Sequence, residues 1–276
     1  MEQVWEGVLQ KMRTSAGERV VYGLTDATPG VEAAELAVNP LVGRPVELRF
    51  LGSFVCTACG RSPERTFDNG YCPDCMKTRA DADICMMKPQ LCHHGQADHP
   101  CRDEVFAVER CFQDHFLYAS LTSDVKVGIT RHTNLPSRWM DQGAVAATTL
   151  ARLPSRRAVG HVEFAMAQDF KDRTHWMKML KSEPDESLLD ETVGRMVARL
   201  VELGAEGLLP PEARTRMRIR YPIEVLPRTV KTLNLERVGS VSGTLAGIKG
   251  QYFIFEDGGV VNIRRHSGHR AAIFVG

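Results

Sequence analysis

Residues 56–75 read CTACGRSPERTFDNGYCPDC, in which Cys56 and Cys59 form one Cys-x2-Cys pair and Cys72 and Cys75 form a second. Each pair places two thiolates on a tight turn, and two such turns complete the tetrahedral four-sulfur shell of a structural zinc ion. Disulfides and buried free thiols are the alternatives, but a reducing compartment disfavours disulfides and paired knuckles at this spacing are typical of zinc sites. The stretch therefore predicts a closed, structural Zn2+ site.

The remaining four cysteines follow within residues 85–111, among several histidines. They do not repeat the knuckle spacing, but four thiolates so close in the chain could close a second shell. The alternative is one or two free buried cysteines beside solvated histidines. We expect a second Zn2+ site held by Cys85, Cys92, Cys101 and Cys111, with His115 as the replacement ligand because Cys111-x3-His115 has ligand-like spacing.

Composition places the chain among ordinary globular proteins. Its 276 residues are 43% hydrophobic and 25% charged, which is enough for one large domain or two to three small ones. No apolar run is long enough to span a bilayer and the first residues do not resemble a signal peptide, so we expect a cytoplasmic protein without membrane contact. The net charge is +1, so any affinity for nucleic acid must come from local patches.

The chain reads as four segments of an α+β protein. Short apolar runs broken by Gly and Pro predict an N-terminal β segment over residues 1–55. The zinc-binding region, 56–115, has few long apolar runs, so metal would substitute for a core there. Residues 116–206 predict an α/β module, and 207–276 predict a C-terminal β domain forming a small sheet or barrel.

The module at 116–206 has a predicted order of strand, strand, helix, strand and then helices. The helical patterns cover residues 155–170 and 174–180, and a further helix follows Ser187, which we expect to be its N-cap, and stops at Gly204.

The sequence HFLYASLTSDVKVGITRHTNLPSRWMDQGA at 115–144 resembles the GIY-YIG nuclease superfamily. Members have a strand with Gly-Ile-Tyr, a second with Tyr-Ile-Gly, Asn-Leu before a helical arginine, a third strand, and a helix with a metal-binding glutamate. Here Tyr118, Lys126, Arg138 and Glu163 would take the corresponding catalytic positions. The resemblance covers residues 116–180 and implies Mg2+ or Mn2+ at Glu163.

The second tyrosine of that pattern is Lys126 in this chain. A lysine could act as a general base only if burial or nearby cations lowered its pKa by several units from about 10.4; otherwise it is a phosphate-binding cation. Without the resemblance, Tyr118 reads as a packed aromatic residue, Arg138 as a surface ion pair and Glu163 as the polar side of an amphipathic helix. We place the loop Asp141-Gln142-Gly143 at the rim of the same site.

A longer stretch of the chain is similar to a prokaryotic family known only as a domain of unknown function. The shared motifs include Cys-x2-Cys-Gly-Arg, Gly-Tyr-Cys-x2-Cys, Arg-Trp-x-Asp-Gln-Gly-Ala and the late Gly-Ile-Lys-Gly-Gln-Tyr. This similarity implies no activity.

Basic residues suggest where DNA or RNA would bind. Alternate arginines on a strand project from one face about 6.5 to 7 Å apart, a spacing that resembles successive phosphates. Like charges on one face require compensation, either by nucleic acid or by acidic side chains such as those of LLDET at 188–192. The candidate nucleic-acid contacts are Arg131, His132, Arg214, Arg216, Arg218 and Arg220.

Three functions fit these patterns. The first is a nucleic-acid-binding zinc protein whose GIY-YIG-like site is a divalent-metal-dependent phosphodiesterase or endonuclease. The second is a non-catalytic nucleic-acid-binding or regulatory protein, and the third is a zinc-scaffolded protein-interaction module. Convergence of Tyr118, Lys126, Arg138 and Glu163 in one concave, positively charged pocket would favour the first, whereas the third predicts that no cleft joins Tyr118, Arg138 and Glu163.

Overall fold

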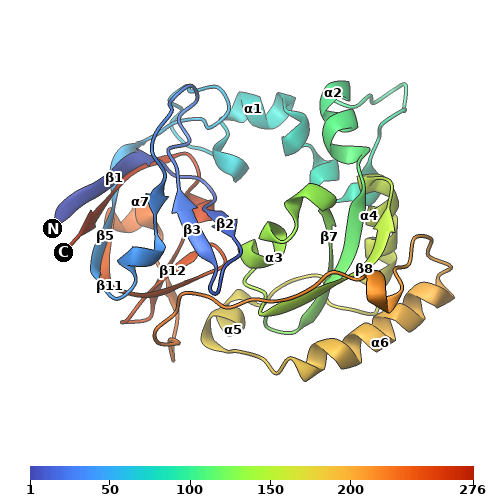
Figure 1. Ribbon diagram of the computed structural model, residues 1–276. Helices are drawn as coiled ribbons and strands as arrows, with labels where there is room; N and C mark the ends of the chain where they lie inside the picture. The colour runs from blue at the N-terminus through green and yellow to red at the C-terminus, as the bar shows by residue number, and fades with distance from the viewer. The chain divides into compact units, whose positions relative to one another are not determined.

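The computed structural model describes residues 1–276 and has a mixed α+β architecture (Figure 1). The chain divides into two compact units. One is Thr78–Ile219, and the other combines Met1–Lys77 with Arg220–Gly276. None of the helices combines the length and the apolar character that a membrane span requires.

The unit Thr78–Ile219 is built on a four-stranded antiparallel sheet in the order β7-β6-β8-β9. The strands are β6 (His115–Leu121), β7 (Val125–Arg131), β8 (Ala146–Leu153) and β9 (Arg216–Arg218). The helices are α2 (Glu104–Phe106), α3 (Ser137–Asp141), α4 (Arg156–Met166), α5 (Trp176–Lys181) and α6 (Ser187–Glu202). From β6 to α6 the elements follow the order predicted from the sequence.

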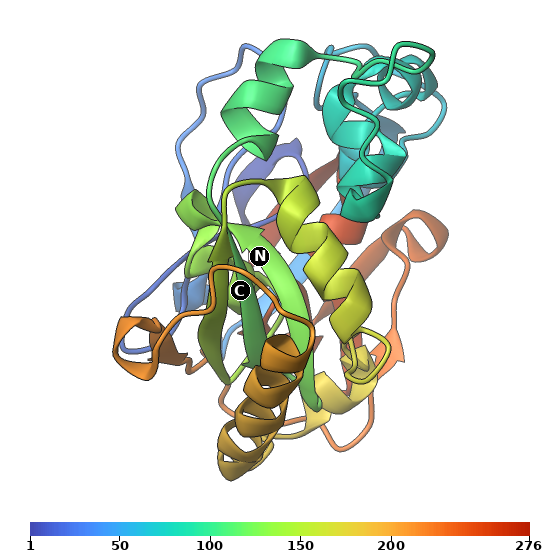
Figure 2. The ribbon, with the colours of Figure 1, turned by 90° about the vertical axis from the view of Figure 1, so that its right-hand side faces the viewer.

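Successive side chains of β6 point alternately into the apolar core and toward the opposite face of the sheet. Leu117, Ala119 and Leu121 are fully buried and belong to one apolar cluster with Val159 of α4 and Met196 of α6. Both helices lie in front of the green strands in Figure 2, which agrees with this packing. The side chains of Tyr118 and Ser120 project from the other face, because successive residues of a strand point to opposite sides.

The helix boundaries follow local capping chemistry. Ser155 is the N-cap of α4 and its side chain accepts a hydrogen bond from the Ala158 N–H. The helix ends at Met166, four residues before the predicted end at 170. Ser187 is the first residue of α6 rather than its cap, since the N-cap position is Glu186; Gly204, with φ of 61°, lies just past the end of this helix as predicted.

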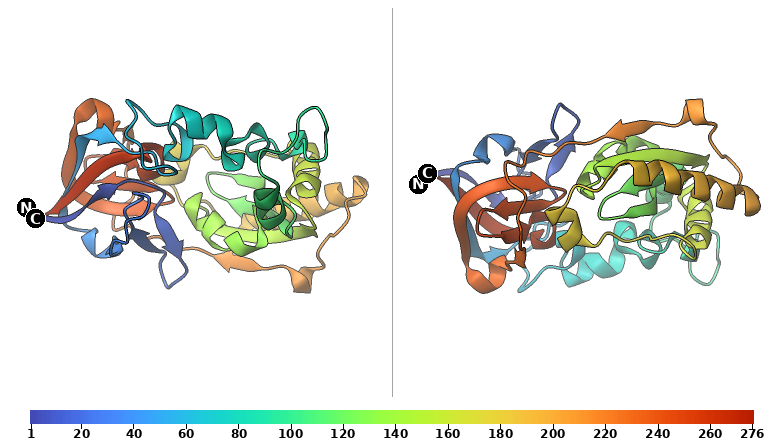
Figure 3. Two further views of the ribbon diagram at one scale, coloured as in Figure 1. Left: turned by 90° about the horizontal axis from the view of Figure 1, so that it is seen from above. Right: turned by 90° about the horizontal axis from the view of Figure 1, so that it is seen from below.

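The second unit is dominated by a seven-stranded sheet in the order β1-β14-β5-β11-β12-β13-β10. Its strands are β1 (Glu2–Val8), β5 (Pro45–Phe54), β10 (Lys231–Thr232), β11 (Ser240–Lys249), β12 (Tyr252–Phe255), β13 (Gly259–Asn262) and β14 (His269–Val275). A small sheet adds β2 (Arg13–Ser15), β3 (Val21–Leu24) and β4 (Leu36–Ala37), and two short helices are α1 (Pro73–Thr78) and α7 (Leu235–Val238). Because β1 pairs with β14, the two chain ends lie side by side (Figure 3).

The units cut the chain after Lys77 and Ile219, whereas the sequence predicts boundaries after residues 55, 115 and 206. Strand pairing accounts for the difference. Residues 1–55 share a sheet with the C-terminal strands, and β9 pairs with β8 instead of joining the C-terminal sheet. The cysteine block is divided as well, with the two knuckles in one unit and the other four cysteines in the other.

Candidate functional site

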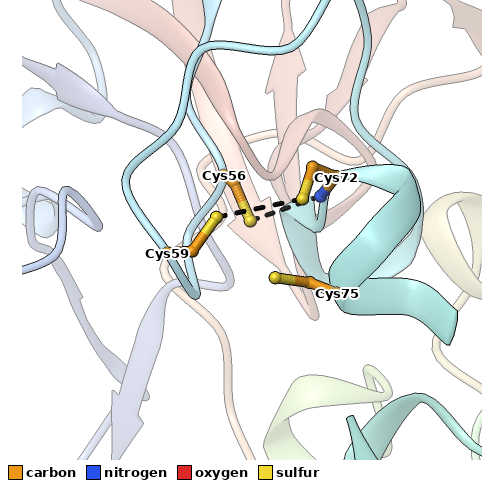
Figure 4. A group of neighbouring side chains, drawn as sticks. All are labelled: Cys56, Cys59, Cys72 and Cys75. Atoms are coloured by element: carbon orange, nitrogen blue, oxygen red, sulfur yellow. Dashed lines mark hydrogen bonds between the residues drawn. The ribbon is translucent and has the colours of Figure 1, made fainter. Parts of the chain in front are cut away.

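The two cysteine knuckles bring four sulfur atoms together. Cys56, Cys59, Cys72 and Cys75, here called the knuckle group, have Sγ atoms that all lie within 4.8 Å of one another (Figure 4). The Cys59 and Cys72 Sγ atoms are 3.9 Å apart. A tetrahedral shell with Zn–S bonds of about 2.3 Å requires S–S separations of about 3.8 Å. The donor set and its spacing therefore fit a zinc ion.

Hydrogen bonds to sulfur support this arrangement. The Cys72 N–H donates to Cys56 Sγ at 3.3 Å. Arg61 donates from Nε to Cys59 Sγ at 3.4 Å and from a terminal N–H to Cys72 Sγ at 3.5 Å, and its guanidinium also pairs with Asp74 at 2.9 Å. The Arg61 hydrogen bond lowers the pKa of Cys59 to about 6. Arg61 thus favours the thiolate form that binds metal and offsets the negative charge of a four-thiolate shell.

The other four cysteines line one cavity in the unit Thr78–Ile219. Cys85, Cys92, Cys101 and Cys111 surround it, and Asp83 and His93 also contribute to its wall. Chain turns too short to bury a core of their own, such as the 3-10 turn Ile84–Met86, position these residues. The cavity lining does not include His115.

His115 lies at the start of β6, where it is buried. Its Nδ1–H donates to the Gln113 carbonyl at 2.7 Å, and burial lowers the pKa of His115 to about 4. A neutral imidazole held in this way is a structural contact of the strand.

A tyrosine and a glycine face each other across the β6–β7 ladder. Tyr118 is paired with Gly128 in the antiparallel register, and a β-carbon at position 128 would lie 2.6 Å from the tyrosine hydroxyl oxygen. Gly128 therefore leaves the space that the ring occupies. Tyr118 is fully buried and donates its hydroxyl proton to Gln142 Oε1 at 3.0 Å, while its oxygen accepts from Arg138 of α3.

Lys126 projects from the same face of the sheet as Tyr118. It pairs across the ladder with Ser120, two residues beyond Tyr118 on β6. The Lys126 side chain is only 6% exposed. Burial, with a further contribution from the Arg138 charge, lowers the pKa of Lys126 to about 8, while Glu163 opposes this shift.

Glu163 is carried to this site by α4. Burial raises the pKa of Glu163, whereas the positive charges of Arg156, Arg138 and Lys126 act to lower it. Three cationic side chains, from β7, α3 and α4, thus lie within electrostatic reach of the Glu163 carboxylate. We call Tyr118, Lys126, Arg138, Arg156 and Glu163 together the Tyr118 site.

Two residues at or near the Tyr118 site, Arg156 and Asp172, were not predicted from the sequence. Arg156 precedes Glu163 by seven residues on α4, and positions i and i+7 share a helix face, so helical spacing from Glu163 was a usable signal. Its Nε is buried and has no hydrogen-bond partner. Asp172, in the chain after α4, influences the pKa of both Lys126 and Glu163, and no local pattern indicated it.

Most of the predicted nucleic-acid contacts have protein partners. Arg216 forms an ion pair with Asp190, and Arg218 pairs with Glu186 at 2.6 Å, so the acidic compensation expected from LLDET is present for Arg216. Arg214 donates to the Leu209 carbonyl at 3.0 Å, and Arg220 belongs to the other unit. Arg131 donates to Thr133 and Asn134, and an exposed His132 bonds the Asp114 carbonyl.

A family model described as "Protein of unknown function (DUF2797)" matches residues 43–271, a span that includes the knuckle group and the Tyr118 site. The sequence similarity to an uncharacterised family is thereby confirmed. No curated protein and no solved structure matches the chain at a significant level.

Proposed function

We propose that this chain, which belongs to the DUF2797 family of proteins of unknown function, is a zinc-containing phosphodiesterase that cleaves nucleic acid at the Tyr118 site. The observation that carries the proposal is the convergence of Tyr118, Lys126, Arg138 and Glu163, which come from two strands and two helices. If Tyr118 were only a packed aromatic residue, Arg138 a surface ion pair and Glu163 the polar side of a helix, nothing would require the three side chains to lie together. The arrangement supports the resemblance to GIY-YIG nucleases.

The charge balance of the site suits a phosphodiester. Arg138 repels both Lys126 and Arg156, and an anion bound beside these three cations would relieve that repulsion. The unpartnered Arg156 Nε is available to an anionic oxygen, and arginine is the side chain best suited to grip phosphate. Burial strengthens these interactions because it lowers the local dielectric.

Lys126 is the residue that we assign as general base. A general base works best when its pKa lies near the operating pH, and a pKa of about 8 meets that condition where an ordinary lysine would not. Neutral Lys126 Nζ would take a proton from the attacking water as the new P–O bond forms and the P–O bond to the leaving group breaks. Tyr118, whose pKa is raised by burial, stays protonated and holds Arg138 and Gln142 in place.

Glu163 is the residue that would hold a divalent ion, with Asp172 nearby. Carboxylate oxygens are the ligands that Mg2+ and Mn2+ prefer, and such an ion would stabilise the charge on the leaving oxygen. The zinc of the knuckle group would be structural, because four thiolates leave no open coordination position.

Cleavage assays test the proposal directly. Metal-loaded protein is incubated with single- and double-stranded DNA and RNA in the presence of Mg2+ or Mn2+, and the wild type is compared with Glu163→Gln and Lys126→Arg. Glu191→Gln is the matched control, since Glu191 is an exposed glutamate on α6. We expect cleavage by the wild type and the control and loss of about 10²-fold or more in both site variants. Cleavage that is equal in all four proteins would come from a contaminant and would refute the proposal.

A second candidate function keeps the binding and omits the hydrolysis. It is favoured by the three cations that act on Glu163 and by the lysine that stands where the resembling nucleases have tyrosine. It predicts tight, salt-dependent binding of nucleic acid without turnover. Binding that is weakened by Arg138→Gln and Arg156→Gln, with intact substrate after long incubation, would favour this candidate over the first.

A further inference from the structure

The wall of the Cys85 cavity contains a compact group of three potential metal ligands. One oxygen of Asp83, the Cys85 sulfur and one ring nitrogen of His93 all lie within 4.8 Å of one another. Asp83 and His93 are only 4% and 7% exposed. Charged and polar ligands that converge away from water are the arrangement from which metal sites are built.

The distance between two of these ligands matches a shared ion. Asp83 Oδ1 and His93 Nε2 are 3.4 Å apart. That separation is longer than the usual N–H···O hydrogen bond of about 2.7 to 3.2 Å. Two ligands bound tetrahedrally to one zinc at about 2.0 to 2.2 Å would be separated by about 3.4 Å.

The protonation of the His93 ring gives a further indication. Its Nε2 is buried and faces only Asp83 Oδ1, at 3.4 Å and without the geometry of a well-formed hydrogen bond, which is rare for a buried ring nitrogen. The opposite nitrogen, Nδ1, lies 2.8 Å from the His99 carbonyl oxygen. A histidine whose Nδ1–H donates to a carbonyl presents an unprotonated Nε2, the tautomer that binds metal.

Neighbouring groups also orient the other two ligands. Asp83 forms an ion pair with Arg102 at 2.7 Å, and the Cys85 N–H donates to Asp83 Oδ1 at 3.3 Å. Cys92, Cys101 and Cys111 line the same cavity, and one of their sulfur atoms can supply a fourth ligand. Ligands and supporting contacts are thus both present.

We propose that Asp83, Cys85 and His93 bind a second zinc-class divalent ion, with the fourth ligand supplied by a cysteine of the same cavity. This ligand set replaces the all-thiolate set that the cysteine spacing suggested. It mixes sulfur, nitrogen and oxygen donors, as zinc and cobalt(II) accept in tetrahedral geometry.

The second ion would also support the Tyr118 site. The Met86 carbonyl, directly after Cys85, accepts a hydrogen bond from Arg156 at 2.6 Å. Pro89 packs so closely on Gly160 of α4 that a β-carbon added at position 160 would lie 2.3 Å from the Pro89 Cβ atom. The segment that contains Cys85 thus rests on the helix that carries Arg156 and Glu163 (Figure 2). This coupling rests on the proposed function, whereas the metal site does not.

Metal stoichiometry on the full-length protein tests the site without any activity assay. We expect two equivalents of Zn2+ in the wild type and one in each of Asp83→Asn, Cys85→Ser and His93→Gln. His94→Gln is the matched control, because His94 is the neighbouring histidine but its Nε2 pairs with Glu104; it should retain two equivalents. Two equivalents in His93→Gln, or one in the wild type, would overturn the proposal.

Cobalt(II) substitution tests the ligand set in the wild-type protein, so its result does not depend on variants that could lose metal because they misfold. In the folded wild type, the second equivalent of Co2+ should add tetrahedral d–d bands and weaker sulfur-to-metal absorption than the first, since the second site has fewer thiolates. Identical spectra for both equivalents would indicate an all-thiolate second shell and refute the mixed ligand set. Iron with acid-labile sulfide in the purified protein would also refute it.

Discussion

Gly128 lies directly opposite Tyr118 in the β6–β7 ladder, with no room for a side chain between the strand and the tyrosine hydroxyl. The hydroxyl oxygen and the adjacent ring carbon would be 2.6 and 2.7 Å from a β-carbon at position 128. The glycine thus determines where Tyr118 lies, and through Tyr118 it positions Arg138 and Gln142.

Replacement of Gly128 by alanine should therefore destabilise the protein. We expect a loss of about 1 to 3 kcal/mol in the free energy of unfolding, because the extra methyl group overpacks a buried ring. Chemical denaturation measures the change. Gly194→Ala is the control, since nothing lies within 4 Å of its β-carbon position on α6, and it should be neutral or stabilise the protein by up to about 1 kcal/mol. If Tyr118 is the cause, Gly128→Ala should cost less in a Tyr118→Leu background.

Lys126 should impose a pH dependence on cleavage. A general base must be unprotonated, and Lys126 loses its proton as the pH rises through its pKa of about 8. Below that value kcat/KM should rise about tenfold per pH unit, and above it the rate should level off. Lys126→Arg should abolish cleavage, because arginine does not deprotonate in this range. A rate or binding affinity that instead falls as the pH rises through 8 would assign Lys126 as a phosphate-binding cation.

Removal of one knuckle cysteine should release the structural zinc. Cys56→Ser leaves three thiolates, and the turns that carry them have little apolar core to hold them. We expect the zinc content to fall by one equivalent and the melting temperature to fall as well, which elemental analysis and thermal denaturation measure. If the zinc content is unchanged, the knuckle group is not a zinc site.

Arg61 should tune the affinity of the knuckle group for zinc. Its hydrogen bonds to Cys59 and Cys72 stabilise thiolates, so Arg61→Gln should weaken zinc affinity by about 10- to 100-fold in competition with a chelator. Arg65→Gln is the matched control, because Arg65 stacks on Phe67. Equal affinities for the two variants would show that Arg61 is only a surface contact.

The β9 arginines should contribute little to nucleic-acid affinity. Arg216 and Arg218 already pair with Asp190 and Glu186, so their charges are compensated within the protein. We expect Arg216→Gln to change affinity and its salt dependence only slightly, and stability by at most about 1 kcal/mol because the pair is exposed. Binding titrations at several salt concentrations would contradict this if the salt slope fell by about one unit.

The order of elements between β6 and α6 could be predicted because it depends on local alternation and helical periodicity. The pairing of β1 with β14 could not be predicted, since neither segment has a sequence pattern that identifies its partner strand at the other end of the chain. The binding partner of the alternating arginines could not be predicted either. Their alternation was visible in the sequence, but whether a phosphate or the Asp190 carboxylate pairs with Arg216 depended on where α6 packs.

By itself the sequence determined the mixed α+β class, the family and the knuckle group, because two Cys-x2-Cys turns carry their ligand geometry in their spacing. The tertiary structure alone decided that Lys126 of β7 and Arg138 of α3 stand beside Glu163 of α4, and that His93 joins Asp83 and Cys85 at the wall of one cavity. The physical reason is that these groups come from separate elements and meet only when helix and turn pack on the sheet. Burial then shifts the pKa of Lys126 to about 8, a property that belongs to the packed site and not to the residue.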